Sequence, residues 1–114
     1  MSTNFVTLLD TINTSGSFVS EKQPGAGYHR QVSNVHTFIL SFNNFIGNVK
    51  LQGTLEIFPG EKDWFTLKNT SNEDIVFVNP DTIPFNLATR GNFMWIRAVG
   101  TLESGEITSI RFAI

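Results

Sequence analysis

The sequence predicts an all-β chain, an antiparallel two-sheet sandwich of jelly-roll-like type with eight or nine strands. Three observations lead to this fold class. Apolar residues recur at every second position in several stretches, which is the period of a half-buried strand. Turn signals such as Pro24-Gly25 and Pro59-Gly60 separate these stretches at intervals typical of an antiparallel sandwich. No stretch carries a convincing apolar stripe at the helical period.

The N-terminal part holds several candidate strands. Ser15-Gly16 and Pro24-Gly25 bound short apolar runs, and Asn43-Asn44 is expected to end a longer run as a turn. In that longer run the even-numbered positions from His36 to Phe42 form one face, which we assign to the core, with His36 at its rim. The candidate strands cover residues 4–9, 18–20, 28–32 and 35–42.

The clearest candidate strand covers residues 49–57 and ends before the turn at Pro59-Gly60. Its odd-numbered positions are apolar or glycine, whereas its even-numbered positions are polar. Gly53 lies on the inner face, where the missing side chain leaves room for a bulky neighbour across the sheet. The residues expected to share one core are Val49, Leu51, Leu55, Ile57, Phe38, Leu40, Phe42, Ile110 and Phe112.

The C-terminal part holds further candidate strands at residues 64–68, 74–78, 82–88, 93–99 and 107–114. Turn signals, such as Asn79-Pro80 and Ser104-Gly105, separate them. The strand at 93–99 differs from the others because both of its faces are apolar. Such a strand is either covered by another layer or part of a subunit interface. The candidate interface residues are Phe93, Met94, Trp95 and Ile96, and we expect a homo-oligomer, with a trimer as the first guess.

Length and composition restrict the classes of protein. The 114 residues suffice for one domain, which we place at residues 1–114. The chain has no cysteine, which excludes disulfides and thiolate metal sites. A net charge of -2 without a basic stripe argues against a nucleic-acid partner. No leader or membrane-length apolar segment occurs, so we expect synthesis in a cytosol and no membrane partner.

The sequence offers no constellation of catalytic residues, so we expect no enzyme and no cofactor. With His29 and His36 as its two histidines, the chain cannot form a three-histidine metal site, and no common catalytic or metal-binding motif occurs. Acidic pairs at Glu61/Asp63 and Glu73/Asp74 lie in expected turns, where acids are usually solvated. A calcium site at the second pair has no further support.

Trp64 is the candidate platform for a ligand, together with Glu61 and Asp63. Sugar sites stack sugars on Trp or Tyr, which combine an apolar ring with a polar group. The chain holds 11 Phe but only 2 Trp and 1 Tyr, a composition that favours packing over sugar binding. We therefore expect Trp64 at the edge of the core, with its indole N–H bonded to a turn carbonyl. The ligand platform is the alternative.

Three segments in order, "NVKLQGTLEIFPGEKDWFTL", "GNFMWIRAVG" and "GEITSIRFAI", resemble small β-sandwich virion structural proteins of tailed phages, especially those of the T4-like cyanophages. The resemblance covers residues 42–114. It implies a non-enzymatic virion component, such as a capsid decoration, a neck or tail part, or a fibre-associated module. Such a component is made in the host cytoplasm, self-associates and docks to other virion proteins. The alternative function is a carbohydrate-binding module for host surface glycans. No catalytic residue is transferred by the resemblance.

Overall fold

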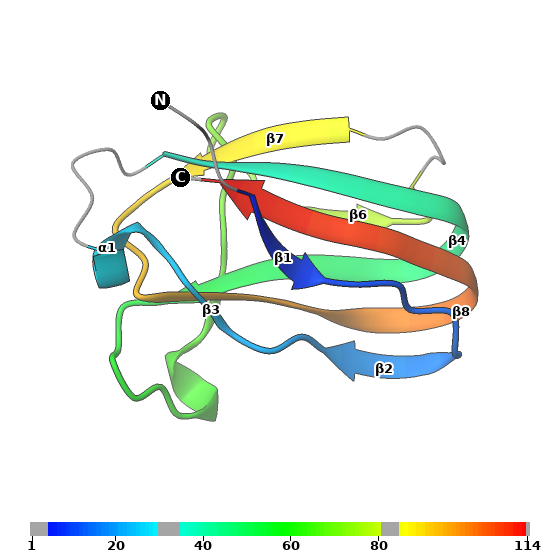
Figure 1. Cartoon of the computed structure of the whole chain (residues 1–114), viewed down its shortest axis with the longest axis horizontal. Coiled ribbons are helices and arrows are strands. Elements are labelled where there is room, and N and C mark those ends of the chain that lie inside the picture. Colours follow the sequence, from blue (N-terminus) through cyan, green and yellow to red (C-terminus); the bar gives the residue numbers. More distant parts are fainter. Residues whose placement is uncertain (1–4, 30–34, 81–84, 114) are drawn as a thin grey trace.

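One curled sheet makes up the fold (Figure 1). The structure, a computed structural model of the chain, describes residues 5–29, 35–80 and 85–113. In these residues eight strands pair into a single antiparallel sheet, which confirms the predicted antiparallel all-β class. In place of the two separate sheets expected of a jelly-roll sandwich, one continuous sheet bends back over itself.

The strands are β1 (Val6–Leu9), β2 (Gly16–Val19), β3 (Gln23–Pro24), β4 (Val35–Thr54), β5 (Phe65–Thr66), β6 (Val76–Val78), β7 (Phe85–Arg90) and β8 (Trp95–Ala113). Two single-turn helices lie in the connections. They are α1 (Ala26–His29) and the 3-10 helix η1 (Glu61–Asp63).

β4 and β8 are the spine of the sheet. They contain 20 and 19 residues and pair from Thr37 opposite Ala113 to Thr54 opposite Trp95. The short strands β1, β2 and β3 pair along the other edge of β8, with Val6 of β1 opposite Phe112. The strands β7, β6 and β5 pair along the other edge of β4. The position of every other strand therefore depends on the spine.

Irregular pairing folds the spine near its middle, where both long strands turn back (Figure 1). Between the pairs Asn43–Glu106 and Ile46–Ser104, Asn44 and Phe45 of β4 face Gly105 of β8 alone. Two residues against one form a bulge, which bends a strand and increases its twist. Gly105 has a φ of 77°, and a Cβ on it would collide with the carbonyl oxygen of Asn44. The turn signals at Asn43-Asn44 and Ser104-Gly105 thus mark bends inside two continuous strands.

The bulge also changes which positions face inward. Before it, even-numbered residues of β4 such as Phe38 and Leu40 are buried, whereas after it the odd-numbered Val49 and Leu51 are buried. One extra residue exchanges the faces of a strand, so both halves of β4 turn their apolar side to the same interior. Phe42, Ile110 and Phe112 are also buried in this core, as predicted.

The inward face of β4 ends at Thr54, short of the predicted end at Ile57. Leu55 and Ile57 are 63% and 57% exposed, so the prediction that they face the core is wrong. β8 begins opposite Thr54, and no described strand pairs with the residues that follow, so the side chains of Leu55 and Ile57 are left exposed. Gly53 behaves as expected, because the Leu67 and Phe93 side chains fill the space that its Cβ would take.

The segment before β4 also differs from the prediction. Tyr28 and His29 belong to α1, and the rest of the candidate strand at 28–32 lies outside the described residues, as do residues 4, 82–84 and 114. His36 is fully buried and does not lie at the rim of the core. Its Nε2 accepts a hydrogen bond of 3.0 Å from the backbone N–H of Ala26, which places the start of α1 against the spine.

Candidate functional site

The predicted interface strand lies at the start of β8, and its four residues separate into two groups. Phe93 is 7% exposed and Ile96 is fully buried, and both belong to the core cluster. They cannot form an outward interface in this fold, because both side chains are enclosed in the core. Met94 and Trp95 are half-buried, so they are the two of these four residues with side-chain surface exposed to solvent.

Trp95 joins three elements on the outer side of the sheet. Its indole N–H donates a hydrogen bond of 2.9 Å to the carbonyl of Ile57, in the connection after β4. Its ring lies 5.0 Å from the ring of Tyr28, and the Lys22 ammonium lies 5.0 Å from the ring centre. A cation over an aromatic face is an attractive contact. Trp95 therefore holds the β4–β5 connection and α1 to the sheet.

Trp64 also lies on the outer side, between η1 and β5. It is half-buried, and the Arg97 guanidinium carbon lies 4.2 Å from the centre of its ring. Arg97 in turn donates a hydrogen bond of 2.9 Å from Nε to Gln52 Oε1. Since neighbouring Leu51 and Ile96 point inward, this contact lies on the opposite face of the sheet. The hydrogen bond from an indole to a turn carbonyl, expected for Trp64, is made by Trp95.

The two acids proposed to accompany Trp64 lie in η1 and are exposed. Asp63 Oδ2 accepts a 2.7 Å hydrogen bond from the backbone N–H of Gly60, which caps the short helix. The other acidic pair is used in a turn as well. Asp74 forms a 2.8 Å ion pair with Lys68, and Glu73 lies beside Asn69. Among the described residues, no group of three or more metal-ligating side chains is found. No described helix has the length and hydropathy of a membrane span.

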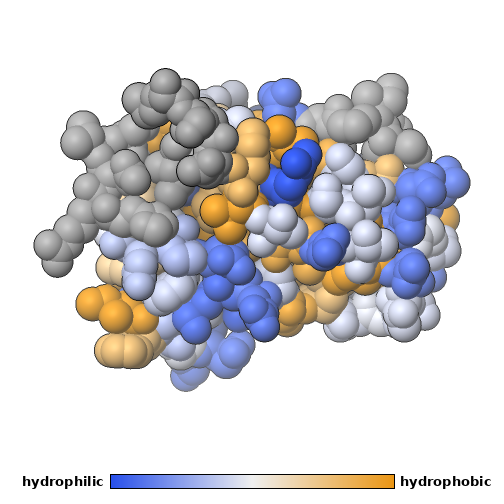
Figure 2. All heavy atoms as spheres, in the orientation of Figure 1, coloured by the Kyte–Doolittle hydropathy of each residue, from blue (hydrophilic) through white to orange (hydrophobic). Residues whose placement is uncertain are grey.

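Sequence reasoning missed an exposed apolar loop, residues 55–58, which connects the end of β4 to η1. Its apolar members are Leu55, Ile57 and Phe58, and Phe58 is 92% exposed. Figure 2 shows apolar side chains protruding at the lower left of the molecule, where this connection lies in Figure 1. Scattered exposed apolar residues are common, but three within four positions of one loop form a patch. The sequence feature that could have indicated an exposed loop is the Pro59-Gly60 turn directly after Phe58.

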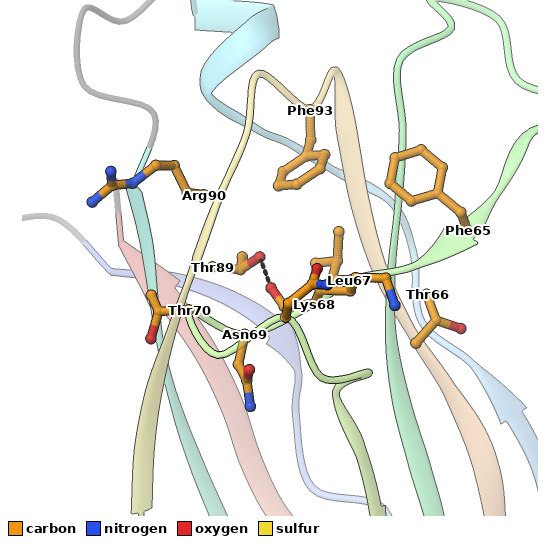
Figure 3. A pocket seen from close by; sticks show the side chains of 10 residues that line it. Phe65, Thr66, Leu67, Lys68, Asn69, Thr70, Thr89, Arg90 and Phe93 are labelled. Atoms are coloured by element: carbon orange, nitrogen blue, oxygen red, sulfur yellow. Dashed lines mark hydrogen bonds between the residues drawn. The ribbon is translucent and has the colours of Figure 1, made fainter.

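A cavity of about 640 Å³ opens between the β5 segment and the end of β7 (Figure 3). Its floor is apolar and consists of Phe65, Leu67 and Phe93. The rings of Phe65 and Phe93 lie 5.9 Å apart at an angle of 55°. Its rim is polar and includes Lys68 and Arg90. Thr89 Oγ1 donates a 2.5 Å hydrogen bond to the carbonyl of Lys68 and ties the two walls together.

These features define a class, a small all-β protein whose surface offers an apolar loop and a cavity and no catalytic cluster among the described residues. Neither a protein-family model nor a curated protein matches the chain. Among solved structures, the chain is similar to the crystal structure of the SPBc2 prophage-derived protein YomS. The TM-score is 0.65 and the identity is 10%, over 98% of this chain and 92% of that chain. At this identity the similarity shows a shared fold.

Proposed function

We propose that the chain is a non-enzymatic structural component of a phage virion, which self-associates and docks to other virion proteins. The observation that carries this proposal is the apolar loop 55–58, with Phe58 92% exposed. The loop directly follows the paired end of β4 and exposes its apolar side chains to solvent. Exposed apolar patches of this kind are typical of surfaces that bind another protein. The fold shared with a prophage-derived protein supports a phage origin, and the sequence segments described above resemble virion proteins.

The first experiment measures the mass of the purified full-length chain by sedimentation equilibrium over a wide concentration range. We expect an oligomer, with a trimer as the first guess. A monomer at the highest concentration would contradict self-association.

The second experiment tests whether the chain is part of the virion. Particles purified on a density gradient from a phage lysate that encodes this chain should contain its peptides at a fixed ratio to the major capsid protein. The protein's absence from particles, with the chain abundant in the same lysate, would contradict a virion role. Genes for capsid or tail proteins should flank its gene.

A second candidate function is carbohydrate binding, and one observation favours it. Both tryptophans and the single tyrosine of the chain lie toward the outer side of the same half of the sheet, and all three are partly exposed. Arg97 covers one face of Trp64, and Lys22 and Tyr28 lie against Trp95, so each ring has limited free surface. We therefore rank this function second.

A glycan array distinguishes the two functions. We expect no specific signal from the wild-type chain. A specific signal that Trp64→Ala abolishes, with an unchanged circular dichroism spectrum, would establish the carbohydrate-binding function instead. Fluorescence titration in a Trp95→Phe background would then assign the signal to Trp64.

A further inference from the structure

We propose that the apolar loop 55–58 of one copy inserts into the cavity beside β5 and β7 of the next copy. This inference rests on the proposed self-association and specifies the surfaces that produce it. The contact is heterologous, because one copy contributes the loop and the other contributes the cavity.

The loop is held in a conformation that projects its apolar side chains. The Trp95 indole fixes the carbonyl of Ile57 at 2.9 Å, and Thr54 Oγ1 accepts a hydrogen bond of 3.2 Å from the Glu56 N–H. At the other end, Asp63 binds the Gly60 N–H. A segment that is ordered before it binds loses less conformational entropy on binding. Phe58, at 92% exposure, lies outside the cavity of its own copy.

The cavity is large enough for an aromatic side chain, and its apolar floor lies within a mostly polar lining. Its volume of about 640 Å³ falls within the range of roughly 300–1,000 Å³ found for ligand pockets. Phe65 is 42% exposed, so part of the apolar floor is open to solvent. Figure 3 shows the rings of Phe65 and Phe93 next to each other, in agreement with their contact at 5.9 Å. A third ring can join such a tilted pair in an edge-to-face contact.

The loop region is acidic, and the cavity border offers it one opposite charge at Arg90. Glu56 lies in the loop, and Glu61 and Asp63 follow it, against one lysine, Lys62. At the rim of the cavity, Lys68 is paired with Asp74, and the acidic Glu73 lies beside Asn69. The other cation of the rim is Arg90, for which no acidic partner is found in the described part of the chain. Opposite charges at the border of an apolar contact fix its orientation and select the partner. This complementarity within one chain is the reason to choose a second copy as the occupant.

Loop and cavity are different surfaces of the same chain, so each copy can use both at once. Heterologous contacts of this kind close into a ring when the rotation permits it and otherwise continue as a filament. A trimer is one such ring.

The test uses two full-length variants that each lose one surface. Phe58→Ser removes the insert, and Phe65→Asp places a carboxylate on the cavity floor. We expect each variant alone to be monomeric by light scattering. Their equimolar mixture should form a dimer and nothing larger, because it combines one intact loop with one intact cavity. Val19→Ser changes an exposed apolar residue on β2 and should retain the wild-type mass. If circular dichroism shows that Phe65→Asp is unfolded, Arg90→Glu serves as the cavity variant in its place.

Cysteine crosslinking tests the geometry directly, because the chain has no cysteine of its own. Gly60→Cys marks the loop without changing its apolar residues, and Thr70→Cys marks the cavity. After mild oxidation the mixture should give a crosslinked dimer, at least about tenfold more than Gly60→Cys alone. A stronger crosslink in Gly60→Cys alone would show loops packed against loops and overturn the proposal.

Two outcomes separate this inference from the proposed function. If the wild-type chain is an oligomer and Phe58→Ser leaves its mass unchanged, the loop-in-cavity contact is wrong and self-association stands. If the wild-type chain is monomeric at high concentration, both self-association and this contact are wrong.

Discussion

At the scale of single residues, burial and not alternation decides what a substitution does in the 49–57 segment. Leu51 is fully buried, whereas Leu55 has the same residue type on the same predicted face and is exposed. We expect Leu51→Ala to lower the free energy of unfolding by about 2–5 kcal/mol through lost burial and a residual cavity. Leu55→Ala should lie within about 0.5 kcal/mol of wild type. Urea denaturation measures both, with Lys50→Ala as the polar control. Equal losses for the two leucines would contradict this register.

His36 provides a second prediction at this scale. Its buried Nε2 accepts a hydrogen bond from the Ala26 N–H. The centre of its ring lies 5.4 Å from that of Phe93 and 6.2 Å from that of Phe112. His36→Phe keeps an aromatic ring but leaves the Ala26 N–H without its acceptor. We expect a loss of about 1–3 kcal/mol in the free energy of unfolding. Hydrogen exchange should show faster exchange of the Ala26 amide. An unchanged exchange rate would contradict a structural role for this bond.

At the scale of elements, the bulge at Asn44 and Gly105 decides whether the spine can fold over. Gly105→Ala puts a side chain at a φ of 77° and into the carbonyl of Asn44. We expect a loss of at least about 1–3 kcal/mol from backbone strain alone. Gly60→Ala is the matched control, because its φ is -89° and its nearest neighbour would be Asp63 Oδ2 at 3.5 Å. Thermal unfolding compares the two variants. Similar midpoints would show that the bend tolerates a side chain.

The sequence predicted the class of these elements well and their connections poorly. Alternation located the buried faces of residues 35–42, 49–53 and 107–112, because period two reports burial directly. It did not show that 35–42 and 49–53 belong to one strand. The change from even-numbered Phe42 to odd-numbered Val49 indicates a bulge in hindsight, but a turn between two strands changes phase in the same way.

The candidate site was harder to predict, because a pattern of apolar residues does not reveal whether a partner covers them. Phe93 and Ile96 looked available and are in the core, whereas Ile57 looked buried and is exposed. Whether these residues are buried depends on the point at which β8 begins to pair with β4. This pairing joins residues far apart in the sequence, so a local pattern does not reveal it. The cavity likewise joins residues of β5 and β7 that are far apart in the sequence.

At the scale of the whole molecule, most pairing joins distant parts of the chain, such as Thr37 with Ala113 and Val6 with Phe112. Long-range antiparallel pairing slows folding, because loops must close before contacts form. We expect refolding in milliseconds to seconds, with one exponential phase in stopped-flow fluorescence. A microsecond phase that accounts for the full amplitude would contradict the topology.

The pairing of Val6 with Phe112 has a consequence for how the chain could be rewired. Because the first and last strands are neighbours, the order of the strands resembles a circle that has been cut between β8 and β1. The cut can be moved to another connection. A short linker from the end of β8 to the start of β1, with new ends opened in the exposed loop at Pro59-Gly60, should give a permuted chain with the same sheet. In that chain β8 would precede β4, and β1 would follow β8 as a local hairpin.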